Sequence, residues 1–330
     1  MNIIIHRGTH QIGGSAIEIS TASTRIILDF GNELSLDEKY TPINLDIDGV
    51  TKGILDCDGI VISHYHMDHL GQLTSALPEI PLYMGELSKE VAMIATQHQD
   101  KDLYLRLLDA NTFRGGEAFT IGNIHIRPLV IDHSAVDSYM FVIEAEGKRV
   151  LYTGDFRMHG VRGHVLEKLI RTYIGNVDVL ITEGTSLSRN AHDGISEREV
   201  LDDISSYIQD GKYVFVMCSS TNIDRIMGIW HNMPTDKVLI CDAYQKRILD
   251  TVIDNVYYNS SLYRRPDSPL VLDIGAYPKY YMDNGFVSLV RGTENYISQI
   301  KKFPKDDVRI IYSMWTCLLY TSPSPRDTER

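Results

Sequence analysis

The sequence predicts an α/β protein in which an αββα sandwich of two mixed sheets carries an inserted, smaller α/β domain with a parallel sheet. Three observations support this prediction. Short apolar runs between glycine-rich turns fill the first half of the 330 residues, and strands alternate with amphipathic helices in the second half. Between the halves, residues 186–196 are polar and indicate a loop.

In the first half, the predicted strands are short apolar runs bounded by turn-forming residues. They are Ile3–Ile5, Ala16–Ile19, Arg25–Leu28, Gly59–Ser63, Ile124–Val130, Ser138–Glu144, Arg149–Thr153 and Val177–Thr182. Residues 88–97 and 103–108 have helical spacing. Because strand-rich stretches are followed by helices twice over, we expect two sheets that face each other between helical layers.

In the second half, strands and helices alternate, which favours a parallel sheet. The predicted strands are 212–217, 237–241 and 308–312, and the predicted helices are 197–210, 222–230 and 244–256. We therefore expect a sandwich domain over residues 1–187 and an inserted domain over residues 188–316. We assign residues 317–330 to neither domain and expect them to form a tail.

Composition narrows the class of protein. The net charge of −12 is the opposite of the basic surface that a general nucleic-acid coat protein needs, but it does not exclude a nuclease, because metal ions supply positive potential locally. The four cysteines form no paired framework, which favours a reduced compartment. We expect a cytoplasmic protein with no membrane segment, since there is neither a leader nor a long apolar run.

The clearest chemical signal follows the predicted strand at residues 59–63. His64, His66, Asp68 and His69 lie within six residues. Alternate residues of an extended segment point the same way, so His64 and His66 can share one metal ion, while Asp68 and His69 can reach a second ion from the helix that follows. These ligands suit zinc, and manganese or iron remains an alternative.

Two further residues complete this cluster at the ends of later strands. His133 follows the strand at 124–130, and Asp155 follows a glycine at the end of the strand at 149–153. A lone histidine is usually a solvated or hydrogen-bonded side chain, but so many ligand types at this spacing favour a metal site. A third imidazole for the first ion and a carboxylate between the ions are what the site still needs.

These motifs resemble the successive metal motifs of the metallo-β-lactamase superfamily. The early segments 11–14 (Gln-Ile-Gly-Gly) and 28–31 (Leu-Asp-Phe-Gly) are similar to the opening strands of that fold. The resemblance implies that His64, His66 and His133 bind one metal ion, that Asp68 and His69 bind another, and that Asp155 bridges them. It also implies that a water between the ions is ionised near neutral pH and held by Asp68 for attack.

Further along, residues 180–185 (Leu-Ile-Thr-Glu-Gly-Thr) resemble the acidic motif that opens the β-CASP branch, which contains the ribonuclease J-like nucleases. In this resemblance Glu183 is a catalytic-site carboxylate that orients a ligand histidine; an ordinary strand-end acid is the alternative. Ser219, Ser220 and Asn222 precede a predicted helix and are candidates for substrate phosphate contacts. Plain helix capping accounts for these three residues equally well.

The resemblance stops at the end of the chain. It implies two more histidines after the insert, but no histidine follows His231. Residues from Cys317 onward resemble a translated sequencing adapter, and a natural disordered tail is the alternative. We therefore expect a truncated chain that binds its second metal ion weakly and is itself inactive.

The favoured function is that of a dinuclear zinc hydrolase, a nuclease that cleaves RNA or single-stranded DNA. The alternative is a small-molecule hydrolase that acts on a lactone, thioester or cyclic phosphodiester, which the acidic charge favours because binding of polyanions gains from basic surface. A non-catalytic scaffold would be expected to lose metal ligands, and all six are present. The sequence leaves open the substrate, exo against endo cleavage, and whether a homo-oligomer forms.

Overall fold

The computed structural model describes residues 1–34, 43–185, 195–272 and 278–314. It divides into two compact units that meet at residues 194 and 195. The predicted boundary at residues 187 and 188 and the predicted tail from Cys317 onward lie outside the described residues. Among the helices that are described, none combines the length and the apolar character needed to cross a bilayer.

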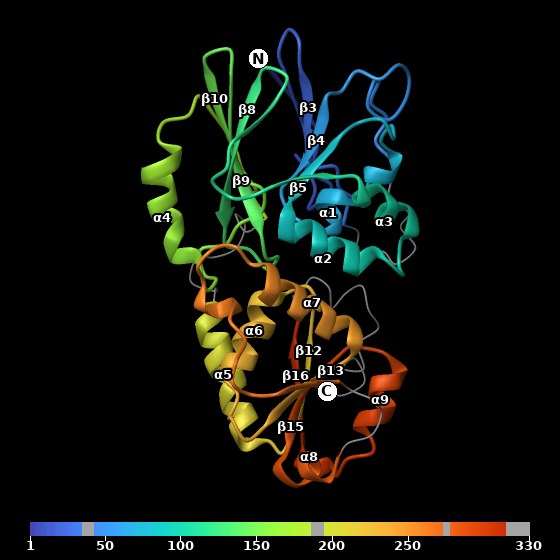
Figure 1. The fold of residues 1–330 in the computed structure, drawn as a ribbon, viewed down its shortest axis with the longest axis vertical. Helices are drawn as coiled ribbons and strands as arrows, with labels where there is room; N and C mark the ends of the chain where they lie inside the picture. Colours follow the sequence, from blue (N-terminus) through green and yellow to red (C-terminus); the bar gives the residue numbers. More distant parts are fainter. Residues whose placement is uncertain (35–42, 186–194, 273–277, 315–330) are drawn as a thin grey trace. The chain divides into compact units, whose positions relative to one another are not determined.

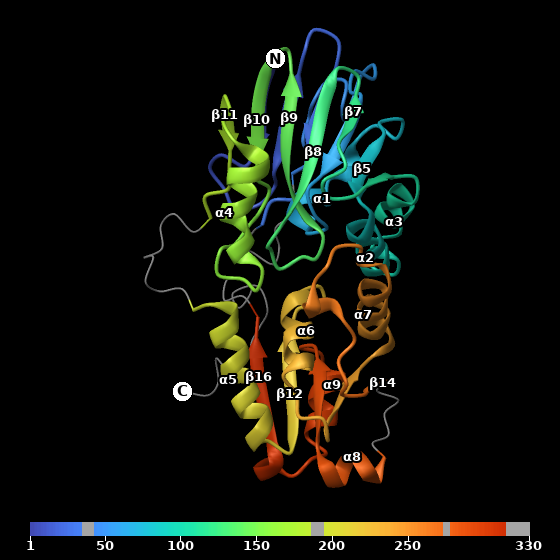
Figure 2. The same ribbon diagram turned by 60° about the vertical axis from the view of Figure 1, so that its left-hand side comes forward.

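Unit 1 is built on two sheets that face each other (Figures 1 and 2). The first sheet has the order β1-β2-β3-β4-β5-β6, with antiparallel pairs up to β3 and parallel pairs from there on. Its strands are β1 (Asn2–Arg7), β2 (Ala16–Ser20), β3 (Arg25–Leu28), β4 (Gly59–Ile62), β5 (Leu82–Gly85) and β6 (Asn111–Phe113). The second sheet, in the order β11-β10-β9-β8-β7, comprises β7 (Phe119–Ile121), β8 (Ile124–Ile131), β9 (Ser138–Ala145), β10 (Lys148–Tyr152) and β11 (Val179–Ile181).

The core of unit 1 lies between these sheets. Ile17 and Ile19 of β2 belong to the same buried cluster as Tyr139 and Phe141 of β9, because every second side chain of each strand points inward. The outer face of β8–β10 packs against α4 (Leu166–Leu169), and α2 (Glu86–Thr96) and α3 (Lys101–Leu108) cover the outer side of β3–β5 (Figure 1). The predicted αββα sandwich is confirmed.

Unit 2 contains a parallel five-stranded sheet in the order β14-β13-β15-β12-β16. Its strands are β12 (Tyr213–Cys218), β13 (Val238–Cys241), β14 (Leu270–Leu272), β15 (Phe286–Val290) and β16 (Val308–Ser313). Its helices are α5 (Glu197–Asp210), α6 (Ile223–His231), α7 (Ala243–Asn255), α8 (Lys279–Asn284) and α9 (Glu294–Ile300). The parallel sheet predicted from the alternation of strands and helices is confirmed, but β14 and the central strand β15 were not predicted.

The two faces of this parallel sheet bury different helices. Tyr213 and Phe215 of β12 pack with Tyr296 of α9 and with partly buried residues of α8. Val214 and Val216 point to the opposite face, where α6 lies close to α5: a Cβ atom on Gly228 would come 2.5 Å from the Leu201 side chain. A glycine is therefore needed where these two helices approach each other.

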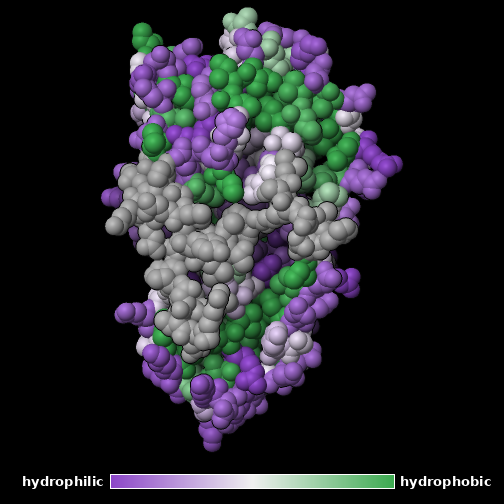
Figure 3. Space-filling model, turned by 180° about the vertical axis from the view of Figure 1, so that it is seen from behind, coloured by the Kyte–Doolittle hydropathy of each residue, from purple (hydrophilic) through white to green (hydrophobic). Residues whose placement is uncertain are grey.

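The surface combines hydrophobic and hydrophilic patches, as the reverse side of the molecule shows (Figure 3). On unit 1, apolar side chains such as Ile4 of the edge strand β1 and Ile54, in the segment between β3 and β4, are exposed. Scattered apolar exposure of this kind is ordinary for folded proteins. The charged side chains that matter for function lie instead at the ends of strands, as described next.

Candidate metal site

The cluster predicted from the sequence begins where the buried strand β4 ends. Ile62 is followed by the buried Ser63 and His64, and the backbone at His66 is extended, with φ −72° and ψ 147°. The short helix α1 (Met67–Leu70) then begins, and the amides of His69 and Leu70 donate to the His66 carbonyl. The change from strand to helix turns His64 and His66 to one side and lets Asp68 and His69 approach from another.

Glycines allow two earlier loops to pack directly against α1. The amides of Gly14 and Ser15 both donate to the Asp68 carbonyl at 3.1 Å. A Cβ atom at Gly31 would lie 1.6 Å from that same carbonyl oxygen, so only glycine fits there. The two glycine-containing segments that resembled the opening strands of the fold therefore hold the position of Asp68.

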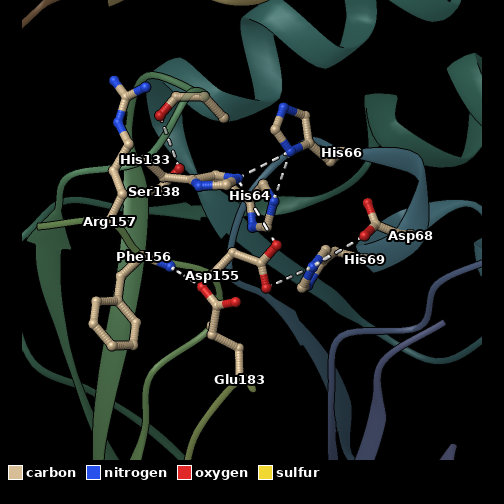
Figure 4. A network of polar contacts seen from close by, with 12 residues as sticks. His64, His66, Asp68, His69, His133, Ser138, Asp155, Phe156, Arg157 and Glu183 are labelled. Carbon is tan, nitrogen blue, oxygen red and sulfur yellow. Dashed lines mark hydrogen bonds and ion pairs between the residues drawn. The ribbon is translucent and has the colours of Figure 1, made fainter. Parts of the chain in front are cut away.

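Three histidines converge on one point (Figure 4). The His66 Nδ1 atom lies 3.0 Å from His64 Nε2 and 3.1 Å from His133 Nε2. The three facing nitrogens lie within 4.8 Å of one another. His133 reaches the cluster from the loop that follows β8, as the sequence predicted. Convergent imidazole nitrogens from two separate segments form a donor set that fits a transition-metal ion.

A second group lies beside the first. Donor atoms of His64, His69 and Asp155 are also within 4.8 Å of one another. One Asp155 oxygen lies 3.3 Å from His69 Nε2, and the other lies 3.9 Å from His133 Nε2. Asp68 Oδ2 is 3.7 Å from His69 Nε2. Asp155 thus lies between the two groups, while Asp68 is at the edge of the second and is not one of its closest members.

A buried residue that the sequence analysis did not select supports this second group. Asp29 follows β3 and is fully buried, with φ +55°. Its carboxylate accepts hydrogen bonds from the Ser63 amide at 2.7 Å, the Tyr152 hydroxyl at 2.5 Å and His69 Nδ1 at 2.7 Å. The bond to Nδ1 leaves Nε2 of His69 facing Asp155 and fixes the ring orientation. The available signal was an aspartate at the end of a predicted buried strand.

Glu183 lies just past β11 and acts on the segment that carries Asp155. Its Oε1 atom accepts a hydrogen bond of 2.9 Å from the Phe156 amide (Figure 4). Burial and the charge of Asp155 raise the pKa of Glu183. Glu183 therefore fixes the backbone of the residue that follows Asp155.

The protonation states of the cluster follow from burial and from charge. Burial, with the neighbouring imidazoles, holds the pKa values of His64 and His133 well below the usual value for histidine. Burial would lower the pKa of His69 as well, but the carboxylates of Asp155 and Asp29 outweigh it and raise this pKa well above the usual value. The charges of Asp155 and Asp29 therefore favour the protonated form of His69, whereas a bound cation would favour its neutral form.

The candidate substrate residues lie in unit 2, at the end of β12. Asn222 caps α6, because its side chain accepts from the Arg225 amide. Ser219 Oγ lies 3.2 Å from the Thr221 hydroxyl, and Ser220 Oγ accepts a hydrogen bond of 3.3 Å from Arg291. Capping accounts for Asn222, whereas Ser220 belongs to a polar cluster considered below.

Comparisons with known proteins identify the architecture around this site. The sequence model of the beta-lactamase superfamily domain matches residues 25–205. An RNase J-like protein of Methanocaldococcus jannaschii is 27% identical over 223 residues, which are 64% of this chain and 49% of that protein. Ribonuclease J 2 of Streptococcus pyogenes is 26% identical over 239 residues, 68% of this chain and 41% of that protein. The chain thus spans about half the length of these relatives or less.

A solved structure supports the same fold. A protein of unknown function from Enterococcus faecalis superposes with a TM-score of 0.73 and covers 95% of this chain and 87% of its own, at 16% sequence identity. The likeness concerns the fold alone. The beta-lactamase superfamily domain implies binding of a divalent metal ion, and the convergent histidines and aspartates are groups that could hold one.

Proposed function

We propose, from the premise that this chain belongs to the metallo-β-lactamase superfamily, that it is a metal-dependent hydrolase that cleaves phosphodiester bonds in RNA or single-stranded DNA. The observation that carries the proposal is the convergence of four histidines and Asp155 into two overlapping donor groups. The ribonuclease names of its relatives favour a nucleic-acid substrate.

The two donor groups support the proposal of two zinc ions, with manganese or iron as alternatives. His64, His66 and His133 would bind one ion. His69 and Asp68 would bind the other, and Asp155 would contact both. Two bound cations would polarise the scissile phosphate and lower the pKa of an attacking water.

The remaining side chains position these ligands and handle the proton. Asp68 keeps 15% of its side chain exposed, so it can reach a water that enters from solvent and accept its proton. Asp29 orients His69 through Nδ1, and Glu183 holds the backbone that follows Asp155. Each of these contacts exists before any substrate binds, which preorganises the site.

The test is cleavage of a labelled single-stranded RNA by the protein in the presence of Zn²⁺ or Mn²⁺. His64→Ala and Asp155→Asn should each abolish cleavage and reduce the amount of bound metal. His125→Ala is the matched control, because this exposed histidine on β8 has its ring hydrogen-bonded to Thr120 and belongs to neither donor group. Cleavage that survives both substitutions, or that needs no metal, would disprove the proposal.

A small-molecule hydrolase is the second candidate, and the net charge of −12 favours it. A polyanionic substrate should bind less tightly as salt rises, because each phosphate contact releases counterions. A lactone, thioester or cyclic phosphodiester would bind with little dependence on salt. Measuring KM for RNA and for these compounds at low and at moderate salt distinguishes a nuclease from a small-molecule hydrolase.

A further inference from the structure

The connections of the parallel sheet in unit 2 change direction along the sheet. From β12 the chain moves in one direction to β13 and β14, and it then returns in the opposite direction to β15 and β16. Right-handed crossovers place connections that run in the same direction on the same face. The helices α6 and α7 therefore cover one face, and α8 and α9 cover the other, as the packing of Tyr281 and Tyr296 with Tyr213 also indicates.

The strand β15 lies between β13 and β12. The helix that follows β15 covers one face of the sheet, whereas the helices that follow β12 and β13 cover the other. In open α/β sheets such a switch of direction leaves space outside the carboxyl ends of the strands, and ligands bind there. The residue that directly follows β15 is Arg291. Its two neighbours across the sheet end in Ser219-Ser220 and in Asp242. A cation, two hydroxyls and a carboxylate thus meet at this switch point.

Arg291 is held in a fixed orientation. Its guanidinium pairs with Asp242, and it lies 5.3 Å from the ring centroid of Tyr244 and 5.7 Å from that of Tyr296. Asp242 in turn caps α7 by accepting from the Gln245 amide at 2.8 Å, and it accepts from the Tyr296 hydroxyl at 3.0 Å. The carboxylate and the two rings therefore restrict the guanidinium before any ligand binds.

This guanidinium still has donors to offer. It makes one hydrogen bond to Asp242 and one, at 3.3 Å, to Ser220 Oγ. Its other N–H groups have no partner among the described residues, and 38% of the side chain is exposed. A planar guanidinium with open N–H groups matches the oxygen atoms of a phosphate. The Ser220 hydroxyl, next to it, can donate to the same phosphate.

We propose that Arg291 and Ser220 form a binding site for a phosphate of single-stranded nucleic acid within unit 2, at the switch point of its parallel sheet. This inference rests on the proposed function for the identity of the polymer. The half-buried Tyr244 ring offers a face on which a base next to that phosphate can stack. Asp242 orients the arginine and at the same time offsets part of its charge, which limits the affinity of the site.

The test uses two substitutions that should act in opposite directions. Binding of a fluorescein-labelled single-stranded RNA is measured by anisotropy with the metal chelated, so that no cleavage occurs. Arg291→Gln should weaken binding roughly tenfold and reduce the salt slope by about 0.7, the value for one lost phosphate contact. Asp242→Asn should strengthen binding, because asparagine keeps the cap of α7 and removes the opposing charge.

A purely structural ion pair predicts a different pattern, in which both substitutions weaken binding or neither changes it; either result would overturn the inference. Arg265→Gln is the matched control, since Arg265 pairs with Asp250 on the exposed surface of the same unit and carries the same charge. It should leave the affinity and the salt slope close to those of the unchanged protein. A nucleoside monophosphate that binds as tightly as the RNA would mean that the site takes free nucleotides, and would also overturn it.

Metal-dependent cleavage by the same variants separates this inference from the proposed function. If Arg291→Gln raises KM and leaves kcat unchanged, both stand. If the protein cleaves RNA and Arg291→Gln changes neither binding nor KM, only the phosphate site fails. If no variant cleaves RNA but the opposite shifts in binding are seen, the phosphate site stands and the nuclease proposal fails.

Discussion

The two units each gather polar side chains at the ends of strands, but they balance the charges differently. In unit 1, His64 and His133 are buried with lowered pKa values, and their nitrogens face one another or the carboxylate of Asp155. In unit 2, Arg291 is half-exposed and already neutralised by Asp242. The first cluster gathers donor atoms that fit a cation, whereas the second presents an arginine whose remaining N–H groups can bind an anion.

This difference indicates how metal binding should affect the stability of each unit. Convergent imidazoles and carboxylates offer donor atoms to a cation, so metal binding should stabilise the unit that holds them. The arginine in unit 2 is held by a carboxylate and two tyrosine rings, so a metal ion should not stabilise that unit. The four predictions below test this contrast, beginning with the largest expected effect.

Metal should stabilise unit 1 far more than unit 2. At a free Zn²⁺ concentration about a thousand times its Kd, the free energy of unfolding of unit 1 should rise by about 4 kcal/mol. Hydrogen exchange of residues in β4 and β10 reports unit 1, while fluorescence of the buried Trp230 reports unit 2, since residues 1–194 contain no tryptophan. His64→Ala should remove the gain. An equal gain at Trp230 would contradict the contrast drawn between the units.

Asp29→Asn should lower metal affinity by roughly 10–100-fold, the effect expected when a group that orients a ligand histidine is neutralised. Asparagine can still accept from the Ser63 amide, so the loop is retained while the charge opposite His69 Nδ1 is lost. Isothermal titration with Zn²⁺ measures the change. Asp58→Asn is the control, because Asp58 also accepts from a backbone amide, that of Arg25, but does so away from the cluster. Equal affinities in the two variants would exclude a role for Asp29 in orienting the ligand.

Glu18→Gln should destabilise unit 1 by about 1–3 kcal/mol at pH 7, because a buried charge-assisted network is broken. Burial would raise the pKa of Glu18, but hydrogen bonds from Arg25 and His6 outweigh it and lower this pKa. A carboxyl group whose pKa is lower in the folded protein stabilises the fold at pH values above its unfolded-state pKa. This stabilisation is lost as the pH falls through the folded-state pKa. The difference between the two proteins should therefore shrink below pH about 4.5.

Urea unfolding followed by hydrogen exchange of unit 1, at pH 7 and at pH 3.5, measures this difference. Glu117→Gln changes the same charge at an exposed position and serves as the control. A difference between Glu18→Gln and the unchanged protein that stays constant over this pH range would show that the loss comes from packing instead of charge.

Ser196→Ala should have the smallest effect, a loss of about 1 kcal/mol confined to unit 2. The Ser196 side chain accepts from the Glu199 amide, and the Glu199 side chain accepts from the Ser196 amide, which forms a capping box at the start of α5. The Trp230 unfolding transition should shift, while zinc affinity stays the same. Ser206→Ala, within the same helix, should shift it less. A change in zinc affinity would show that the units are coupled.

The candidate metal cluster could be predicted from the sequence because most of its residues are close together in the chain. His64, His66, Asp68 and His69 follow one buried strand, and local geometry alone brings them to one place. His133 and Asp155 were also predicted, since each lies shortly after the end of a strand. Asp29 was not, because its bond to His69 spans two strands and has no local pattern.

The second cluster could not be predicted in the same way. Ser220 was selected as a candidate, but its partner Arg291, and Asp242 that pairs with Arg291, follow strands that are far apart in the chain, and β15 itself was not predicted. Arg225 of α6, which is close in sequence to Ser220, pairs instead with Glu197. Sequence patterns identify a strand end, whereas the order of strands in the sheet decides which ends are neighbours.

The sequence by itself determined the fold class, the parallel sheet of the second unit and the residues of the metal cluster, since these depend on periodicity and on spacing over a few residues. Only the tertiary structure decided which carboxylate orients His69, which backbone Glu183 holds and which strand end faces Ser220. The physical reason is that hydrogen bonds and ion pairs between distant segments depend on strand order and register, and neither is encoded in the pattern of a single segment.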